Sequence, residues 1–226
     1  MYKNILLSAS VMCMDWFDIK NQMNVIEKSE IDYLHFDIID GYFAHDFTMG
    51  SSIIDVFRQN SKLPSDYHLM VEEPARIFDT FNTNKFDNIT IHQETSRNLH
   101  RNIMSLKNKK VKVGVALCPA TPISTLEYIL DDLDLIIIMT VNPGFKGQPL
   151  VPQALRKISD LKKLINRMKL KAKISVDGYV NLNTIPEMVS AGADILVLGS
   201  TGLFQKNKSI QESIIEIKES IDKGLK

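Results

Sequence analysis

Short apolar runs alternate with longer amphipathic runs along almost the whole chain, and this alternation constrains the fold more than any other feature. The apolar runs are rich in Val, Ile and Leu and have strand length, whereas the runs between them repeat apolar residues at helical spacing. The run at 133–141 is nearly continuously apolar, as expected for a parallel strand buried on both faces. The predicted strands cover 5–9, 33–39, 67–71, 88–92, 111–117, 133–141, 172–176 and 194–198.

A helix is expected after each predicted strand. The first is expected to begin near Asp15 and to bury Phe17 and Met23. Others are predicted at 74–81, where a proline opens the helix, and at 122–130. Eight such units in 226 residues, with no polar linker long enough to divide them, predict a single-domain α/β protein, a (β/α)8 TIM barrel over residues 1–226. A doubly wound open sheet is the alternative, but it normally has fewer strands.

Composition excludes several classes of protein. Basic and acidic residues balance at 27 each, so no basic excess points to nucleic acid or to an anionic membrane surface. No apolar stretch reaches the roughly 18 residues that a membrane-spanning helix needs. Cys13 and Cys118 form no C-x-x-C pair, which argues against a disulfide framework or a thiolate zinc site. We expect a cytoplasmic protein with a small-molecule partner.

Histidines and aspartates cluster at or near the ends of three predicted strands. In the segment 34–41, His35 and Asp37 alternate with apolar residues and therefore share one face of a strand. His68 begins a similar pattern on the next strand, and Asp177 ends another strand just before a glycine. In a parallel barrel these strand ends meet at one face, so the four side chains are expected to lie together.

The mixed nitrogen and oxygen set of His35, Asp37, His68 and Asp177 favours one divalent metal ion, namely Zn, Fe, Mn or Co, with Mg also admissible. The alternative is a satisfied core histidine with capping aspartates, which suits a lone histidine better than this set. Inward-facing charges without a metal or substrate would also carry a large desolvation cost. For His92, at the end of another strand, a place beside the site and a core position both stay open.

Three glycine-containing turns follow the last three predicted strands, at 142–148, 177–179 and 199–202. Glycine lets backbone N–H groups approach an anion closely, and Lys146 would add positive charge. Glycines also serve simply to make tight turns, so one such turn would be weak evidence. Three successive turns at the same face of a barrel favour a phosphate site, which in this fold typically lies by the last two strands.

Together these segments resemble the ribulose-phosphate 3-epimerase family along essentially the whole chain. The motifs that carry the resemblance are Ser10, 34–41, 68–71, 119–122, 139–145, 176–178 and 199–200.

The resemblance implies a (β/α)8 barrel, a divalent metal on the four residues named above, and Asp37 and Asp177 as the catalytic acid and base. Inverting a carbon beside a ketone requires removing its proton on one face and returning one on the other, which suits two aspartates on different walls. A metal would stabilise the negative charge that develops on the substrate oxygens. The residues implied for substrate binding are Ser10, His68, Gly144, Phe145, Lys146, Gly147, Gly178, Tyr179, Gly199, Ser200 and Thr201.

Within the family, the segments 11–15, 94–95, 147–149 and 202–204 are most similar to D-allulose-6-phosphate 3-epimerases. They predict epimerisation of D-allulose 6-phosphate to D-fructose 6-phosphate. The alternatives are D-ribulose 5-phosphate to D-xylulose 5-phosphate, and a phosphosugar-binding barrel without catalysis. Tyr179 and Lys146 stand where many pentose-phosphate members have small residues. A homo-oligomer, either a dimer or a hexamer, is also expected.

Overall fold

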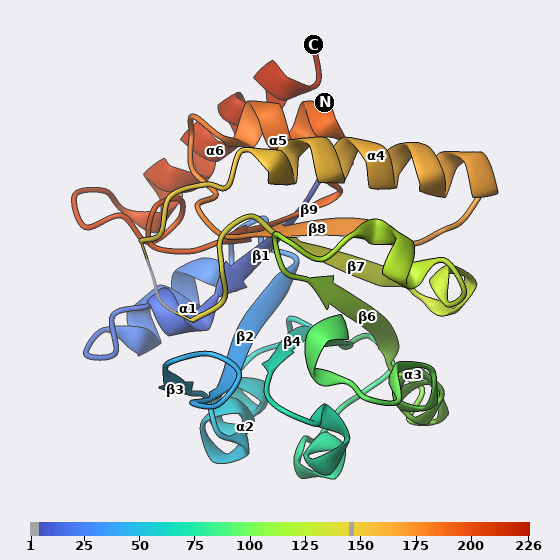
Figure 1. The fold of residues 1–226 in the computed structure, drawn as a ribbon. Helices are drawn as coiled ribbons and strands as arrows, with labels where there is room; N and C mark the ends of the chain where they lie inside the picture. Colours follow the sequence, from blue (N-terminus) through green and yellow to red (C-terminus); the bar gives the residue numbers. More distant parts are fainter. Residues whose placement is uncertain (1–4, 145–146) are drawn as a thin grey trace.

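A closed barrel of parallel strands forms the centre of the computed structural model, which describes residues 5–144 and 147–226 (Figure 1). The strands are β1 (Leu6–Ser10), β2 (Tyr33–Asp40), β4 (Ser65–Met70), β5 (Asn88–His92), β6 (Lys112–Leu117), β7 (Leu135–Met139), β8 (Lys173–Asp177) and β9 (Ile195–Leu198). Each pairs with its neighbours in parallel, and β1 closes the ring by pairing with both β9 and β2. The predicted single-domain TIM barrel is therefore confirmed.

Helices surround the barrel on the outside (Figure 1). They are α1 (Ile19–Ile26), α2 (Ser51–Asn60), α3 (Leu99–Asn108), α4 (Gln153–Met168), α5 (Ile185–Ala191) and α6 (Ile210–Gly224). The helices pack against the barrel through apolar faces. In the long helix α4, the apolar residues Ala154, Ile158, Leu161 and Ile165 recur at helical spacing and are all buried. The main apolar core accordingly lies between the outer face of the strands and these helices. No helix among the described residues is both long and apolar enough to cross a membrane.

Two predicted helices are wrong. Short 3-10 turns replace the helix expected at 74–81, at Pro74–Arg76 and Phe78–Thr80, and the one expected at 122–130, at Ile123–Leu126. A proline in the first turn is compatible with a helix, so it does not explain the difference; both segments contain β-branched or polar residues that favour helices poorly.

The first helix also differs from its prediction. It begins only at Ile19, after Asp18, and buries Met23 as expected. Phe17 lies in the preceding turn and is fully exposed, which makes its predicted burial wrong. One apolar residue that precedes a helix can match the helical spacing without belonging to the helix.

Two strand differences bear on the site. Strand β4 begins at Ser65, two residues earlier than predicted, so Asp66 lies within the strand and shares the inward face with His68. The loop expected after β2 contains a two-residue strand, β3 (Phe47–Thr48), that pairs antiparallel with the end of β2. The Thr48 hydroxyl donates a hydrogen bond to the carbonyl of Asp37, so β3 braces the strand that carries this aspartate.

Candidate active site

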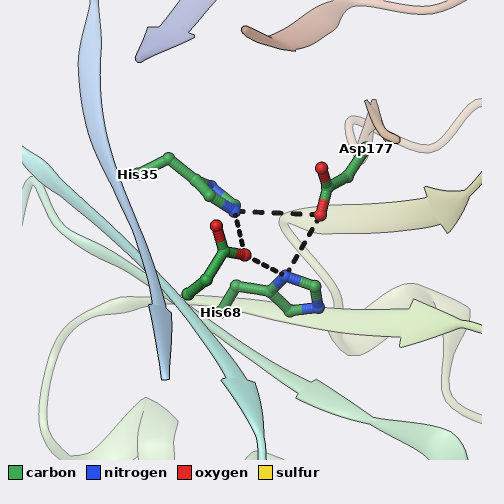
Figure 2. A group of neighbouring side chains, drawn as sticks. His35, His68 and Asp177 are labelled. Carbon is green, nitrogen blue, oxygen red and sulfur yellow. Dashed lines mark hydrogen bonds and ion pairs between the residues drawn. The ribbon is translucent and has the colours of Figure 1, made fainter. Parts of the chain in front are cut away.

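The register of β2 and β4 sets histidines and acids side by side. Asp37 is the direct neighbour of His68, and His35 is the direct neighbour of Asp66. The barrel then brings Asp177, the last residue of β8, to the same place. Figure 2 shows His35, His68 and Asp177 converging on one point, and Oδ1 of Asp37 contacts a ring nitrogen of each histidine.

Contacts among the four predicted metal ligands are close. Nε2 of His35 lies 3.1 Å from Oδ1 of Asp37 and 3.9 Å from Oδ2 of Asp177. Nδ1 of His68 lies 3.2 Å and 3.3 Å from the same two oxygens. One donor atom from each residue lies within 4.8 Å of the other three. The four side chains that the sequence singles out are thus brought together as one cluster.

The electrostatics of this cluster suit a divalent cation. Burial alone would lower the pKa of His35, but the charges of Asp37 and Asp66 outweigh it and raise that pKa well above its usual value. Burial opposes the ionised form of Asp37, yet His35 and His68 hold the pKa of that carboxyl well below its usual range. The raised pKa values of His35 and His68 therefore favour imidazolium rings beside these carboxylates.

Exchanging two ring protons for one divalent ion would keep the same charge balance and leave a nitrogen lone pair on each histidine. Two imidazole nitrogens and two carboxylate oxygens form a donor set that suits Zn, Fe, Mn or Co. These residues therefore fit the metal that the sequence predicts.

A second row of polar residues holds these ligands in place. Nδ1 of His35 lies 2.8 Å from Oδ2 of Asp66, which is fully buried and also accepts a hydrogen bond from Ser8. The hydroxyl of Ser10 donates to Oδ2 of Asp37 at 3.0 Å, leaving Oδ1 of that carboxylate to face the rings. Such partners fix the orientation of metal ligands.

The end of β8 is clamped to the end of β7. The backbone N–H of Thr140 donates to the carbonyl of Asp177 at 2.8 Å, and the Thr140 hydroxyl donates to the same oxygen at 3.0 Å. Gly178 then turns the chain with φ of +111°, and a Cβ there would lie 2.5 Å from a methyl carbon of Val141. Glycine is therefore required at this position, directly after the predicted catalytic aspartate.

A pocket opens beside the metal cluster at the carboxyl ends of the strands. Asp37 and Asp177 line its inner end, with Met70 and Met139 among its apolar walls. Of the residues predicted to bind substrate, Phe145 and Lys146 lie outside the described residues. His68 does not line the pocket: it is fully buried behind it, in the metal cluster. The remaining predicted residues, Ser10, Gly144, Gly147, Gly178, Tyr179, Gly199, Ser200 and Thr201, all line the pocket.

Three residues near the site were not assigned a role from the sequence. Asp66 faces inward because it lies two residues before His68 on the same strand, a spacing that could have identified it. His92, which stayed open between two interpretations, is fully buried with Nε2 only 2.9 Å from Nε2 of His68. Glu94 lies next to His92, with Oε2 3.0 Å from its Nδ1, but a turn residue of this kind has no periodicity to reveal it.

Comparisons with known proteins show the family of the chain. Residues 6–204 match the model of the ribulose-phosphate 3-epimerase family. The chain is 39% identical over 211 residues to the ribulose-phosphate 3-epimerase of Bacillus subtilis (strain 168), covering 92% of this chain and 97% of that protein. It is 36% identical to the chloroplastic ribulose-5-phosphate-3-epimerase of Arabidopsis thaliana, covering 96% of this chain and 77% of that protein.

The chain belongs to the ribulose-phosphate 3-epimerase family. Membership makes it an isomerase, a 3-epimerase that acts on sugar phosphates. The two inward-facing aspartates and the adjacent pocket of this epimerase are the features that such chemistry requires.

Comparisons with solved structures support the fold and nothing more. N-(5'-phosphoribosyl)anthranilate isomerase from Pyrococcus furiosus superposes with a TM-score of 0.61 at 13% identity, covering 96% of this chain and 98% of that one. Thiamine phosphate pyrophosphorylase from the same organism gives a TM-score of 0.60 at 10% identity, covering 100% and 98%. At such identities the likeness supports the barrel and nothing about the site.

Proposed function

We propose that this epimerase interconverts D-ribulose 5-phosphate and D-xylulose 5-phosphate. The observation that carries the proposal is the meeting of Asp37 and Asp177, from β2 and β8, at the inner end of one pocket in a chain of this family. The Bacillus subtilis and Arabidopsis thaliana relatives carry the corresponding names, which supports the pentulose phosphate over a longer sugar.

The two aspartates would move the proton at C3. One carboxylate removes it from one face of the carbon, giving an enediolate, and the carboxyl group of the other returns a proton to the opposite face. The roles of Asp37 and Asp177 exchange when the reaction runs backwards. Because these residues stand on strands that β1 and β9 separate in the barrel, they reach the substrate from different sides.

His35, Asp37, His68 and Asp177 would hold one divalent metal ion. When bound, such an ion acts as a Lewis acid that stabilises negative charge on the substrate oxygens next to the reacting carbon. The same four side chains also keep the catalytic carboxylates in place, since each aspartate contacts a buried histidine. Ser10 holds the far oxygen of Asp37 and so limits rotation of the carboxylate.

The other end of the pocket would bind the phosphate group. Gly144, Gly147 and Gly178 have φ between +82° and +136°, so their turns adopt conformations that L side chains rarely adopt. Turns of this kind present backbone N–H groups that bind anions. Lys146, between two of these glycines in the sequence, is proposed to add positive charge.

Assembly into a homo-oligomer stays a prediction.

D-Allulose 6-phosphate is the second candidate substrate. Met12, Cys13 and Gln148 line the pocket, and they come from the segments that resemble the hexulose-phosphate enzymes. The deciding experiment compares kcat/KM of the metal-loaded enzyme for the pentulose and hexulose phosphates in parallel. A clear preference for D-ribulose 5-phosphate supports the proposal, a preference for D-allulose 6-phosphate replaces its substrate, and activity on neither supports a binding protein without catalysis.

A further inference from the structure

A row of hydrogen-bonding groups runs from the proposed metal site to the loop after β6, and the proposed mechanism does not use it. Nε2 of His68 lies 2.9 Å from Nε2 of His92, and Nδ1 of His92 lies 3.0 Å from Oε2 of Glu94. We propose that Glu94 and His92 are positioning residues that fix the tautomer of His68, so that its Nδ1 carries the lone pair offered to the metal. This inference rests on the proposed metal site.

The carboxylate of Glu94 is held so that it can only accept hydrogen bonds. Its Oε1 accepts from the backbone N–H of Cys118 at 2.8 Å and from the hydroxyl of Thr121. Lys157 of α4 in turn donates to the carbonyls of Cys118 at 2.8 Å and Thr121 at 2.7 Å, which pins this loop. Although burial opposes ionisation, the hydrogen bonds from His92 and Thr121 lower the pKa of Glu94 to about 2.

The tautomers follow step by step from this fixed acceptor. Because Oε2 of Glu94 accepts, Nδ1 of His92 must carry the proton of the neutral ring. Nε2 of His92 is then an acceptor, so Nε2 of His68 must be the donor between the two rings. Neutral His68 thereby keeps its lone pair on Nδ1, which faces the oxygens of Asp37 and Asp177.

The placement of the rings supports this sequence of hydrogen bonds. The His68 and His92 rings have centroids 5.0 Å apart and planes only 24° apart, so the two Nε2 atoms meet almost edge to edge. Both rings are fully buried, so bulk solvent does not compete for either Nε2. Phe43 packs against His92 with centroids 4.7 Å apart and restricts its rotation.

The tautomer of His35 is fixed by a single partner. Asp66 accepts directly from Nδ1 of His35, which leaves Nε2 of that ring as the ligand atom. The two histidines thus present different nitrogens to the metal, because one has a carboxylate as its outer partner at Nδ1 and the other has a second imidazole at Nε2. Partners of this kind typically contribute 10–100-fold to metal affinity.

His92, Glu94 and Cys118 also lie close enough together to suggest a separate metal site. The hydrogen bonds argue against it, since Oε1 and Oε2 of Glu94 already accept from three donors. Burial and the charge of Glu94 also raise the pKa of the Cys118 thiol, which disfavours the thiolate a metal would need. One metal ion per chain is therefore expected.

The direct test measures ring 15N shifts of the wild-type protein loaded with Zn²⁺. The proposal predicts that His92 carries its proton on Nδ1 and that His68 carries its proton on Nε2, with one Zn²⁺ bound per chain. A proton on Nε2 of His92, or a second Zn²⁺ bound at His92 and Glu94, would overturn the proposal. Absence of any Zn²⁺ binding would instead refute the metal site on which the inference rests.

Substitution of Glu94 by glutamine gives a second, independent test. The amide oxygen of Glu94→Gln is expected to take the hydrogen bond from the Cys118 N–H, which turns the amide NH2 towards Nδ1 of His92 and reverses the tautomers. The dissociation constant for Zn²⁺ should then rise about 10–100-fold, with kcat recovering as Zn²⁺ is raised.

The matched control is Glu73→Gln, because Glu73 is a similarly covered glutamate paired with the exposed Arg97 rather than with a histidine. Its Zn²⁺ affinity should equal that of the wild type. An unchanged affinity in a folded Glu94→Gln variant would contradict the proposal. If that variant does not fold, the wild-type ring shifts decide the question together with His92→Phe. This substitution keeps an aromatic ring against Phe43 but removes the Nε2 that accepts the hydrogen bond from His68.

Discussion

The two ends of the pocket are built by different means. At the inner end, side chains on β2, β4 and β8 converge. His35, Asp37 and His68 are buried, and Oδ1 of Asp37 lies 3.1–3.2 Å from a ring nitrogen of each histidine. At the outer end, turns after β7 and β8 line the pocket, and their glycines have φ between +82° and +136°. Charge and register define the first end, whereas backbone conformation defines the second.

This difference predicts different responses to substitution. A changed side chain at the inner end alters charge at the reacting atoms while the barrel stays folded, because the main apolar core lies outside the strands. A changed residue at the outer end alters the path of the backbone, which affects substrate affinity and stability together. Mutations at the two ends should therefore separate into effects on kcat and effects on KM.

Asp177→Asn is expected to have the largest effect of the substitutions considered. An amide cannot exchange a proton with C3, so kcat should fall by about 10²–10⁴-fold, the usual contribution of a general acid or base, with little change in thermal stability. The control is Asp194→Asn, which removes an aspartate at the opposite end of the barrel that accepts from the Ile174 N–H. Steady-state kinetics and thermal melts should show the reverse pattern there, with lower stability and retained turnover.

Removal of metal by a chelator should abolish turnover without unfolding the barrel. His35, His68 and the two aspartates contribute no apolar core, and protonated rings can replace the charge of the ion. Far-UV circular dichroism should therefore stay unchanged while activity is lost, and adding back Zn²⁺, Mn²⁺, Co²⁺ or Fe²⁺ should restore it. Full activity after exhaustive chelation would show that the inner end works without a metal.

Gly178→Ala tests the outer end by crowding its backbone. The new Cβ would meet Val141 at 2.5 Å and would also be held at φ of +111°. We expect a destabilisation of about 1–3 kcal/mol and a larger KM for the phosphorylated substrate. Gly147→Ala is the matched comparison, because no atom of the described residues lies within 4 Å of a Cβ added there and the φ of +82° is the strain that remains. If both variants lose the same stability, crowding by Val141 is not the cause.

Tyr179→Gly should have the smallest effect on the folded protein. Tyr179 lines the pocket with φ of +50°, so glycine relieves strain but adds freedom to the unfolded chain. These opposing contributions should leave the free energy of unfolding within about 1 kcal/mol of the wild type. A change in relative kcat/KM for pentulose and hexulose phosphates would assign its side chain to substrate discrimination, whereas unchanged ratios would limit its role to the backbone.

The same contrast explains what the sequence could predict. Alternation of apolar and polar residues along strands is regular, so the barrel and the positions of His35, Asp37, His68 and Asp177 follow from it. Asp66 was missed only because the start of its strand was placed two residues late. Periodicity could not assign Glu94 a role, because its position depends on hydrogen bonds from a loop 24 residues further along the chain.

Helix predictions failed for a related reason. The segments at 74–81 and 122–130 each have a proline start and apolar residues near helical spacing, yet they form 3-10 turns. Local propensity is weak there, and packing against the barrel decides the backbone path. The exposed Phe17 shows the same limit, since apolar character alone does not place a residue on the buried face of a helix.

Solvent isotope incorporation during turnover tests the central claim most directly. The metal-loaded enzyme would be incubated with D-ribulose 5-phosphate in D₂O, and the product would be examined by mass spectrometry and NMR. Two exchangeable carboxyl groups acting on one carbon predict D-xylulose 5-phosphate with a single deuterium at C3. Product without deuterium at C3, or with deuterium at C1, would contradict proton transfer by Asp37 and Asp177 at that carbon.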